Sequence, residues 1–453
     1  MKINVYLSMI SLFKRDIENK LSEWRKSTAR KPLILRGARQ VGKTSVVFQF
    51  AKQFEYFIAL NLEDIRDQNI FHQHPEIDEL IEYLFFIHDI PKNKMGETLL
   101  FIDEIQAMPE VVNSLRFFYE RHAELAVIAA GSTLETLLNR KASYPVGRIE
   151  FMIMKPVSFS EFLLAIGEDR LHKAYSQHPF NTLAHLELLE WFHIYAIIGG
   201  MPEIVDRYRK TKDLAVLRPV YESLITSYIE DADKFASNNN QSNYIRHAIR
   251  GSLFEAGKRI KFEGFWSSNY GSREMKESLT LLEMAFLVRL VYPTVETRFP
   301  YSQNFRKSPR LQFLDTGLMN FAQGLQKNLF GSSNFAKEQG GLVIEHVVGQ
   351  ELMTVQRDTQ NPLLFWVRDK TGSSAELDFL FKTEDSMIPI EVKSGGAGKL
   401  KSLMQYLENS ETSKAVRLSQ SPYSVEEHTL PSGKRFTLIN LPYYLASKVE
   451  MYW

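Results

Sequence analysis

The sequence predicts an α/β protein whose N-terminal part is built on a parallel sheet. Short apolar runs at residues 32–35, 99–102 and 125–130 each end in polar or glycine-rich residues, as buried parallel strands do. The first run is followed by a glycine-rich turn and then by a helical pattern that places Val46, Val47 and Phe50 on one face. Because 453 residues exceed one ordinary core, we expect further domains after this one.

Composition sets limits on the classes of function. Hydrophobic residues make up 44% of the chain and charged residues 24%, which is typical of a folded globular protein. A net charge of +1 gives no overall attraction to nucleic acid, so any such contact requires a local patch. The absence of cysteine excludes disulfides and thiolate metal sites, and we expect a cytoplasmic location. No apolar run reaches the roughly 18 residues of a spanning helix, so no membrane association is expected.

The glycine-rich turn is the strongest motif. Residues 37–44 read GARQVGKT and match G-x-x-x-x-G-K-[ST] in full, between a strand and a helix candidate. In such a loop backbone N–H groups surround a phosphate, Lys43 neutralises the β and γ oxygens, and the Thr44 hydroxyl ligates Mg²⁺. We therefore predict ATP and Mg²⁺ as cofactors. The residues expected to bind the nucleotide are Gly37, Ala38, Arg39, Gln40, Val41, Gly42, Lys43, Thr44, Ser45 and Asp103.

Two acids follow the second apolar run. A buried parallel strand that ends in carboxylates is what a Mg²⁺·ATP site requires beside its phosphate loop. We expect Asp103 to hold the Mg²⁺ together with Thr44, and Glu104 to orient the attacking water. An Asp-Glu pair at the end of a strand is also common as plain structure, and the phosphate loop favours the catalytic interpretation.

Two further residues are candidates for catalysis. The third apolar run ends at Ser132, where a small polar side chain can sense the γ-phosphate. Arg148 precedes another apolar strand and can act as an arginine finger, either in its own subunit or in a neighbour's site. The alternative for Arg148 is an ordinary surface arginine. Action in a neighbour's site would require a homo-oligomer.

Several segments together resemble the bacterial and archaeal AAA+ ATPases that carry a C-terminal domain of unknown function, and the likeness covers almost the whole chain. It implies an ATPase core at residues 1–165, with Lys43, Thr44, Asp103 and Glu104 as nucleotide residues and Ser132 and Arg148 in the sensor and finger positions. The segments that carry the likeness are GARQVGKTS, LLFIDEIQ, RFFYE, VIAAGS, PVGRIEFMIMKPVSFSEF, IIGGMPEIV, FLDTGLMN, GLVIEHVVGQEL, ELDFLF and IPIEVKSG.

The middle of the chain predicts two smaller domains. Apolar residues at spacings of three and four predict helices over 166–236, similar to the helical lid of an AAA+ module. Residues 237–300 read as helix, turn, helix and strand, which favours a winged helix. Such a domain contacts either DNA phosphates or a protein partner. Its exposed basic residues are expected to be Lys258, Arg259, Lys261, Arg273 and Lys276.

The last predicted domain spans 301–453. Asp378 ends one strand candidate, and Glu391 and Lys393 lie on one face of the next, because residues i and i+2 of a strand share a face. This D…E-x-K arrangement resembles the PD-(D/E)XK nuclease-like fold, and Glu345 resembles its N-terminal acid. The acids would hold a second Mg²⁺ while the lysine polarises the attacking water or the phosphate. The alternative is a hairpin with a salt bridge.

These observations favour Mg²⁺-dependent ATP hydrolysis that switches a DNA-associated assembly. One alternative is an ATP-gated regulator that grips a protein partner and uses the C-terminal domain as a scaffold. Another is a metal-dependent nuclease licensed by ATP. Salt-dependent DNA binding distinguishes the first two, because a protein-docking module should show none.

Overall fold

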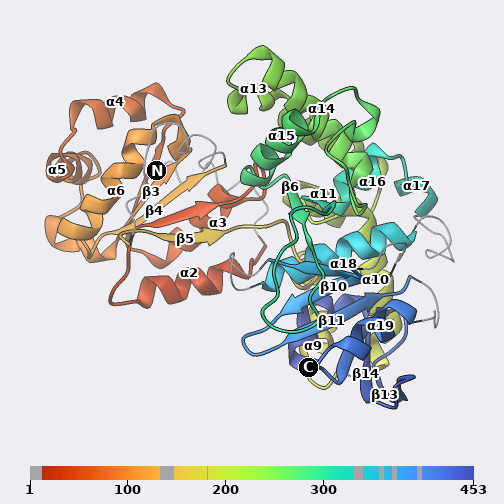
Figure 1. Ribbon diagram of the computed structural model, residues 1–453. Coiled ribbons are helices and arrows are strands. Elements are labelled where there is room, and N and C mark those ends of the chain that lie inside the picture. Colours follow the sequence, from red (N-terminus) through yellow and green to blue (C-terminus); the bar gives the residue numbers. More distant parts are fainter. Residues whose placement is uncertain are drawn as a thin grey trace. The chain divides into compact units, whose positions relative to one another are not determined.

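The computed structural model describes residues 13–132, 147–180, 182–329, 340–356, 362–369, 375–394 and 400–453. The chain divides into two compact units (Figure 1). The first contains the residues up to Pro156 and the short segments 233–237 and 284–287; the second contains 157–232, 238–283 and 288–453. The three later predicted domains thus fall largely in one unit, and their boundaries after residues 236 and 300 stay predictions.

The first unit is built on a five-stranded sheet in which every strand pairing is parallel, which confirms the predicted core. The strand order is β2-β3-β4-β1-β5. Because β4 lies between β1 and β3, the C-terminal ends of these three strands are neighbours at one edge of the sheet. The strands are β1 (Leu33–Arg36), β2 (Tyr56–Asn61), β3 (Thr98–Asp103), β4 (Ala126–Gly131) and β5 (Glu150–Ile153).

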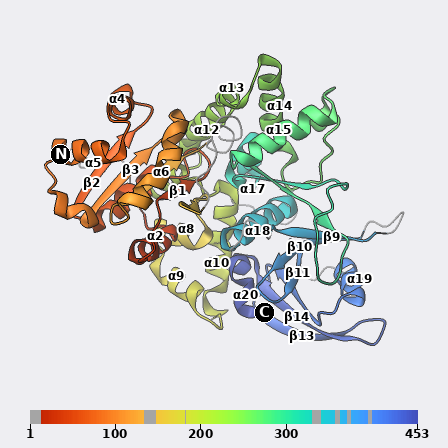
Figure 2. The ribbon, with the colours of Figure 1, turned by 60° about the vertical axis from the view of Figure 1, so that its left-hand side comes forward.

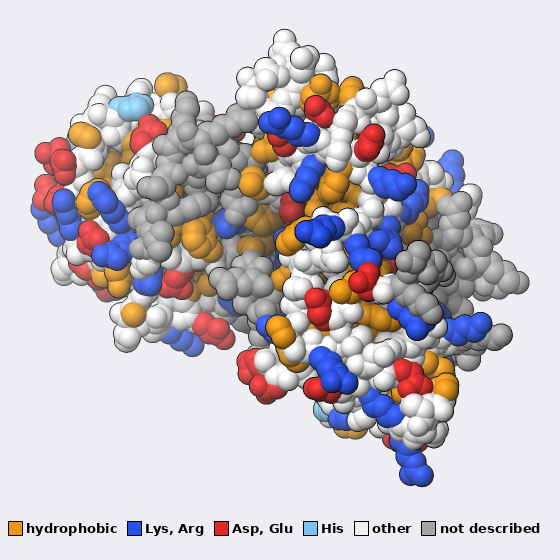
Figure 3. All heavy atoms as spheres, viewed as in Figure 1, with side chains coloured by type: hydrophobic (Ala, Val, Ile, Leu, Met, Phe, Trp, Pro, Cys, Tyr) orange, Lys and Arg blue, Asp and Glu red, His pale blue; other side chains and the backbone are white. Residues whose placement is uncertain are grey.

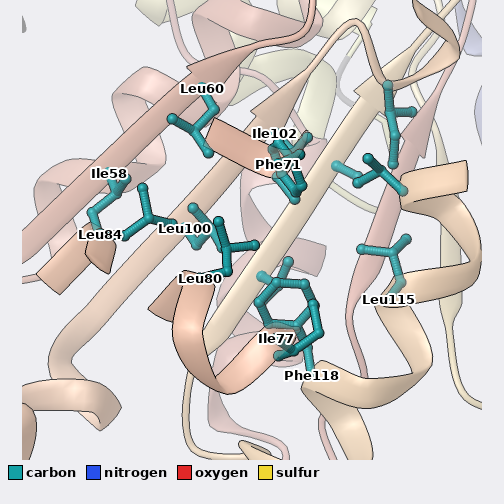
Figure 4. Close-up of a cluster of buried hydrophobic side chains, with 14 of the residues drawn as sticks. Ile58, Leu60, Phe71, Ile77, Leu80, Leu84, Leu100, Ile102, Leu115 and Phe118 are labelled. Atoms are coloured by element: carbon teal, nitrogen blue, oxygen red, sulfur yellow. The ribbon is translucent and has the colours of Figure 1, made fainter. Parts of the chain in front are cut away.

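Apolar side chains of α5 and α6 pack on one face of this sheet (Figure 4). Leu80 and Leu84 lie one helical turn apart and meet Ile58 and Leu100 of the strands. Burying such a side chain stabilises the fold by about 1.5–3 kcal/mol. The helices of the unit are α2 (Ile17–Lys26), α3 (Lys43–Phe50), α4 (Ile65–Gln73), α5 (Ile77–Ile87) and α6 (Pro109–Arg121).

The second unit begins with helices: the first precedes residue 166, the following ones lie within 166–236, and the interpretation of that range as a helical lid stays a prediction. A capping box starts the first of them, because Ser158 accepts from the Glu161 N–H and Glu161 accepts from the Ser158 N–H. These helices are α8 (Phe159–Ala165), α9 (Asp169–Ser176), α10 (His185–Ile198), α11 (Pro202–Thr211), α12 (Arg218–Glu230) and the short α13 (Ala232–Phe235), which crosses into the first unit.

The segment predicted as a winged helix contains α14 (Asn239–Glu255), α15 (Ser272–Met284) and β6 (Val288–Val291). The strand β6 pairs antiparallel with β8 (Arg310–Phe313) in a separate two-stranded sheet. Two helices followed by a two-stranded antiparallel sheet agree with the predicted element order. The winged-helix interpretation itself stays a prediction.

The remainder of the second unit is a seven-stranded mixed sheet in the order β13-β14-β12-β11-β10-β9-β7. Figure 2 shows β13 and β14 as a hairpin at one edge. The α19 helix packs Leu403, Tyr406 and Leu407 against the strands. The strands are β7 (Pro293–Thr294), β9 (Leu364–Val367), β10 (Glu376–Lys382), β11 (Met387–Val392), β12 (Lys414–Ser419), β13 (Ser424–Thr429) and β14 (Arg435–Pro442), and the helices are α16 (Thr316–Ala322), α17 (Gln326–Leu329), α18 (Gly341–Val355), α19 (Lys401–Asn409) and α20 (Val449–Tyr452).

Within the described residues, no helix combines the length and the apolar character needed to cross a membrane.

Candidate functional site

The glycine-rich turn joins β1 to α3 at the C-terminal edge of the first sheet. Gly37 has φ 145°, and a Cβ there would lie 2.2 Å from the carbonyl oxygen of Met154. Gln40 and Gly42 also have positive φ angles, 64° and 95°. Residues with a Cβ atom rarely adopt positive φ angles. Gly37 and Gly42 therefore allow the loop to turn tightly above the first turn of α3. Backbone N–H groups at the start of a helix form a favourable site for an anion.

Lys43 is buried beneath this loop, with 8% of its surface exposed. Its Nζ donates to the carbonyl oxygens of Gly37 at 3.0 Å and Ala38 at 2.9 Å. Burial lowers the pKa of Lys43 to about 8, while Glu104 and Asp103 oppose this effect. The ammonium group is therefore held inside the loop and is still charged at neutral pH.

Thr44 and Asp103 meet at the end of the loop, as the sequence predicts for a Mg²⁺ site. The Thr44 hydroxyl donates to Asp103 Oδ2 at 2.7 Å, and the Glu104 N–H donates to Asp103 Oδ1 at 3.0 Å. Burial raises the pKa of Asp103 to about 6. Both hydrogen-bond donors are neutral, and a hydroxyl beside a carboxylate is the oxygen donor set that Mg²⁺ prefers. These residues therefore fit the predicted ion.

Glu104 occupies a sharp turn just after β3. Its φ of 50° and ψ of 44° lie in the left-handed region, and the chain then enters the 3₁₀ turn Ile105–Ala107. Its carboxylate accepts a hydrogen bond from the side-chain amide of Gln106. Ser132, which follows β4, is buried between the ends of β1 and β3. The predicted sensor position therefore lies beside the phosphate loop, whereas Gln106 is a residue that the sequence analysis missed.

A second missed residue supports the loop from behind. Arg15 precedes α2 and is 6% exposed. It donates to the carbonyl oxygens of Val41 at 3.1 Å and Lys155 at 2.7 Å. It thereby ties the phosphate loop to the segment after β5. No motif marks this arginine, because its partners are backbone atoms 26 and 140 residues away.

Arg148 lies near the N-terminal ends of the strands, opposite the end at which the phosphate loop lies. The start of β5, Glu150, is paired with Leu33 at the start of β1, whereas the phosphate loop follows the end of β1. Arg148 precedes β5 by two residues, is half exposed, and its Nε lies 3.2 Å from Glu120 Oε1 near the end of α6. The structure does not bring Arg148 to the phosphate loop of its own chain, so only supply to another subunit stays a prediction.

The C-terminal acids also gather, but around an arginine. The buried guanidinium of Arg310 on β8 contacts the carboxylates of Glu345 and Glu376, and lies 4.0 Å from Asp378 Oδ1. It also donates to the backbone oxygen of Asp378 at 3.0 Å. Sequence reasoning missed Arg310, which lies outside the D…E-x-K pattern. A positive charge thus already lies among the acids predicted to hold a second Mg²⁺.

The other acids of the pattern also have partners. Lys393 forms an ion pair with Glu391, and Asp378 Oδ2 accepts from the Val392 N–H at 2.8 Å. Burial raises the pKa values of Glu345 and Glu391 to about 7. In the described part of the chain, no group of three or more histidine or acidic side chains is arranged to hold a metal ion. The second metal site stays a prediction that Arg310 makes less favourable.

The basic residues predicted to face DNA are exposed, but three of the five have acidic partners. Lys258 pairs with Glu255 at 3.4 Å, Arg259 with Glu376 at 3.3 Å and Arg273 with Glu277 at 3.0 Å. Lys261 and Lys276 are exposed and form no ion pair with another residue that the structure describes. On the face shown in Figure 3, basic and acidic side chains of the second unit are interspersed.

Comparison with known proteins supports the N-terminal interpretation. Residues 29–163 match the family model described as AAA domain, and residues 189–329 and 340–444 match two families described as domains of unknown function (DUF8612 and DUF4143). No curated protein matches the chain.

Among solved structures, a Walker-type ATPase of Pyrococcus abyssi is similar to this chain, with a sequence identity of 15% and a TM-score of 0.43. The likeness covers 69% of this chain and 96% of that chain. PCH-2 of C. elegans shows 13% identity, with 45% of this chain and 64% of that chain covered and a TM-score of 0.27. The family match over residues 29–163 and the geometry of the phosphate loop together support a P-loop ATPase core in this part of the chain.

Proposed function

We propose that the first unit binds and hydrolyses ATP in the presence of Mg²⁺. The observation that carries this proposal is the hydrogen bond between Thr44 and Asp103. It joins the last residue of the phosphate loop to the end of β3 and so places two oxygen ligands beside the N-terminus of α3. Thr44 and Asp103 would hold Mg²⁺ there, and the ion would neutralise charge that develops on the phosphates in the reaction.

The chain's own residues divide the remaining work. Lys43 and the N–H groups at the start of α3 bind the phosphates in the ground state. Glu104 follows Asp103 directly and lies at the same edge of the sheet, where its carboxylate can orient the attacking water. Ser132, which directly follows β4, would contact the γ-phosphate.

The test is ATP binding and turnover by the purified chain. Lys43→Ala should abolish binding, whereas Glu104→Gln should retain binding and lose turnover, because Glu104 acts only in the reaction. Undiminished turnover by Glu104→Gln would remove this residue from the catalytic site. Chelation of Mg²⁺ by EDTA should stop hydrolysis by the wild-type protein.

The wider role that we propose is the switching of a DNA-associated assembly. The support for this role is the element order of α14, α15, β6 and β8 together with the exposed Lys261 and Lys276. The paired state of the other three cations favours the alternative in which this surface grips a protein. Retention of duplex DNA that declines with salt would support the DNA role, and its absence at low salt would favour the protein partner.

Nuclease activity is a second candidate, favoured by one observation. Glu345, Asp378 and Glu391 do come together, and Lys393 lies beside Glu391 as the pattern requires. If these residues form a working centre, the purified chain should nick DNA in Mn²⁺ and Lys393→Ala should not. Equal nicking by both proteins would show that the activity comes from elsewhere.

A further inference from the structure

The side chain of Gln106 lies between the end of β3 and the end of β4. The left-handed turn at Glu104 directs the chain into the 3₁₀ turn, and Gln106 Nε2 donates to Glu104 Oε2. A carboxylate accepts hydrogen bonds but does not donate them when it is ionised. The nitrogen of the amide must therefore face Glu104, and the oxygen must face away from it.

The oxygen of this amide lies against β4. A Cβ added to Gly131 would lie 2.5 Å from Gln106 Oε1, which is closer than such atoms approach one another. Gln106 Oε1 is buried, and no residue that the structure describes donates a hydrogen bond to it. The amide group is thus confined between the Glu104 carboxylate and the backbone of Gly131. The glycine at position 131 provides the space that this arrangement needs.

We propose that Gln106 is a positioning residue for Glu104. It holds one carboxylate oxygen of Glu104, so that the other oxygen is presented to the attacking water. A glutamate side chain without such a contact samples several rotamers, and only some of them direct the carboxylate at the reaction. This inference rests on the proposed ATPase function and extends it to a residue outside the phosphate-loop motif.

The first test is steady-state ATP hydrolysis by Gln106→Ala. We expect kcat to fall about 10- to 100-fold, as misplacement of a catalytic group does, while KM and the affinity for ATP change less than about twofold. The matched control is Gln53→Ala, because Gln53 is an exposed glutamine of the same unit. That variant should keep the kcat of the wild type.

Gly131→Ala provides a second route to the same displacement. Its methyl group should displace the Gln106 amide and lower kcat, although Gln106 itself is unchanged. In the Gln106→Ala background there is no amide to displace, so adding Gly131→Ala should change kcat by less than about twofold. This pair forms a double-mutant cycle, in which two changes that act through one group are not additive.

The outcomes separate this inference from the function on which it rests. If the wild type hydrolyses ATP and Glu104→Gln does not, but Gln106→Ala keeps full kcat, the inference is wrong and the ATPase stands. The inference is also wrong, and the ATPase function still stands, if Gly131→Ala lowers kcat equally in the wild-type and Gln106→Ala backgrounds. If the wild type neither binds nor hydrolyses ATP, both fail. Thermal unfolding of each variant checks that a lower kcat is not a loss of folded protein.

Discussion

The two clusters of buried acids in this protein differ in what neutralises them. In the first unit, the hydrogen bonds that Asp103 receives from described residues come from a hydroxyl and an N–H group, and Lys43 acts on it electrostatically. In the second, the acids surround the guanidinium of Arg310, and Glu391 is paired with Lys393. A carboxylate whose hydrogen-bond donors are neutral keeps its negative charge and can attract a metal cation. A carboxylate paired with a protein cation is already largely neutralised.

This difference suggests that similar acid-rich motifs have different uses in the two units. On the function proposed above, the phosphate loop and Asp103 form a site that Mg²⁺·ATP would complete. The acids around Arg310 already have cations beside them, and removing one partner from such a cluster costs more than the cluster contributes as a whole. We therefore assign chemistry to the first cluster and expect the second to act mainly in stability.

The largest expected effect comes from a matched pair of substitutions. Asp103→Asn should lower ATP turnover by about 100-fold or more, because it removes the charge that holds Mg²⁺ at a phosphoryl-transfer site. Asp378→Asn should leave ATP turnover within about twofold of the wild type. The measurement is phosphate release at saturating ATP. A comparable loss in both variants would show that the two clusters are not independent.

The second prediction concerns Arg310. Arg310→Met should lower the free energy of unfolding of the second unit by about 3–5 kcal/mol, because it removes the buried cation that Glu345, Glu376 and Asp378 share. Denaturant unfolding with and without Mn²⁺ measures this. We expect little rescue by Mn²⁺, and Arg310→Lys serves as the charge-conserving control. Full rescue by Mn²⁺ would show that a metal can take the place of the guanidinium and would revive the nuclease hypothesis.

The third prediction tests the supply of Arg148 between subunits. Arg148→Ala should lower ATP turnover about 10³-fold or more if it acts as a finger, with ATP affinity little changed. Because Arg148 lies at the far edge of its own sheet, mixing Arg148→Ala with Glu104→Gln should restore part of the activity. Absence of both effects would leave Arg148 as a surface residue paired with Glu120.

The fourth prediction is a pH window for Mg²⁺·ATP binding. Burial raises the pKa of Asp103 to about 6, so below that pH its carboxyl is protonated and is a poor ligand. Burial lowers the pKa of Lys43 to about 8, so above that pH its charge is lost. Affinity should therefore be highest between about pH 6 and pH 8. Titration calorimetry of Asp103→Asn should show an affinity that still falls above about pH 8, where Lys43 loses its charge, but that no longer falls below about pH 6.

Much of the first unit could be predicted because its signals are local. The phosphate loop, the strand before it and the acids after β3 are each contiguous in the sequence, and their chemistry follows from residue type and spacing. Gln106 was missed because its role depends on the left-handed turn at Glu104 and on the lack of a side chain at Gly131. Neither feature is visible in a spacing pattern.

The second unit was harder because its contacts are long-range. The pattern that includes Asp378 and Glu391 is complete in the sequence, yet the residue that decides its charge is Arg310, which lies 68 residues before Asp378. The basic residues of the predicted winged helix are exposed, as expected from the sequence. Their acidic partners include Glu376, however, which lies 117 residues after Arg259. Charge pairing across such distances requires the tertiary structure.

The smallest expected effect concerns DNA, and it separates paired from unpaired cations. If this surface contacts phosphates, Lys261→Ala with Lys276→Ala should lower the slope of log K against log salt by about 0.9 for each lysine. Arg273→Ala should change the slope less, because Arg273 already lies 3.0 Å from Glu277. It would then neutralise a DNA phosphate less effectively and release fewer of the cations condensed on the DNA. Filter binding of duplex DNA over a range of salt gives these slopes. A slope that responds equally to all three residues would mean that the ion pair opens on binding, whereas no salt-dependent binding at all would assign this surface to a protein partner.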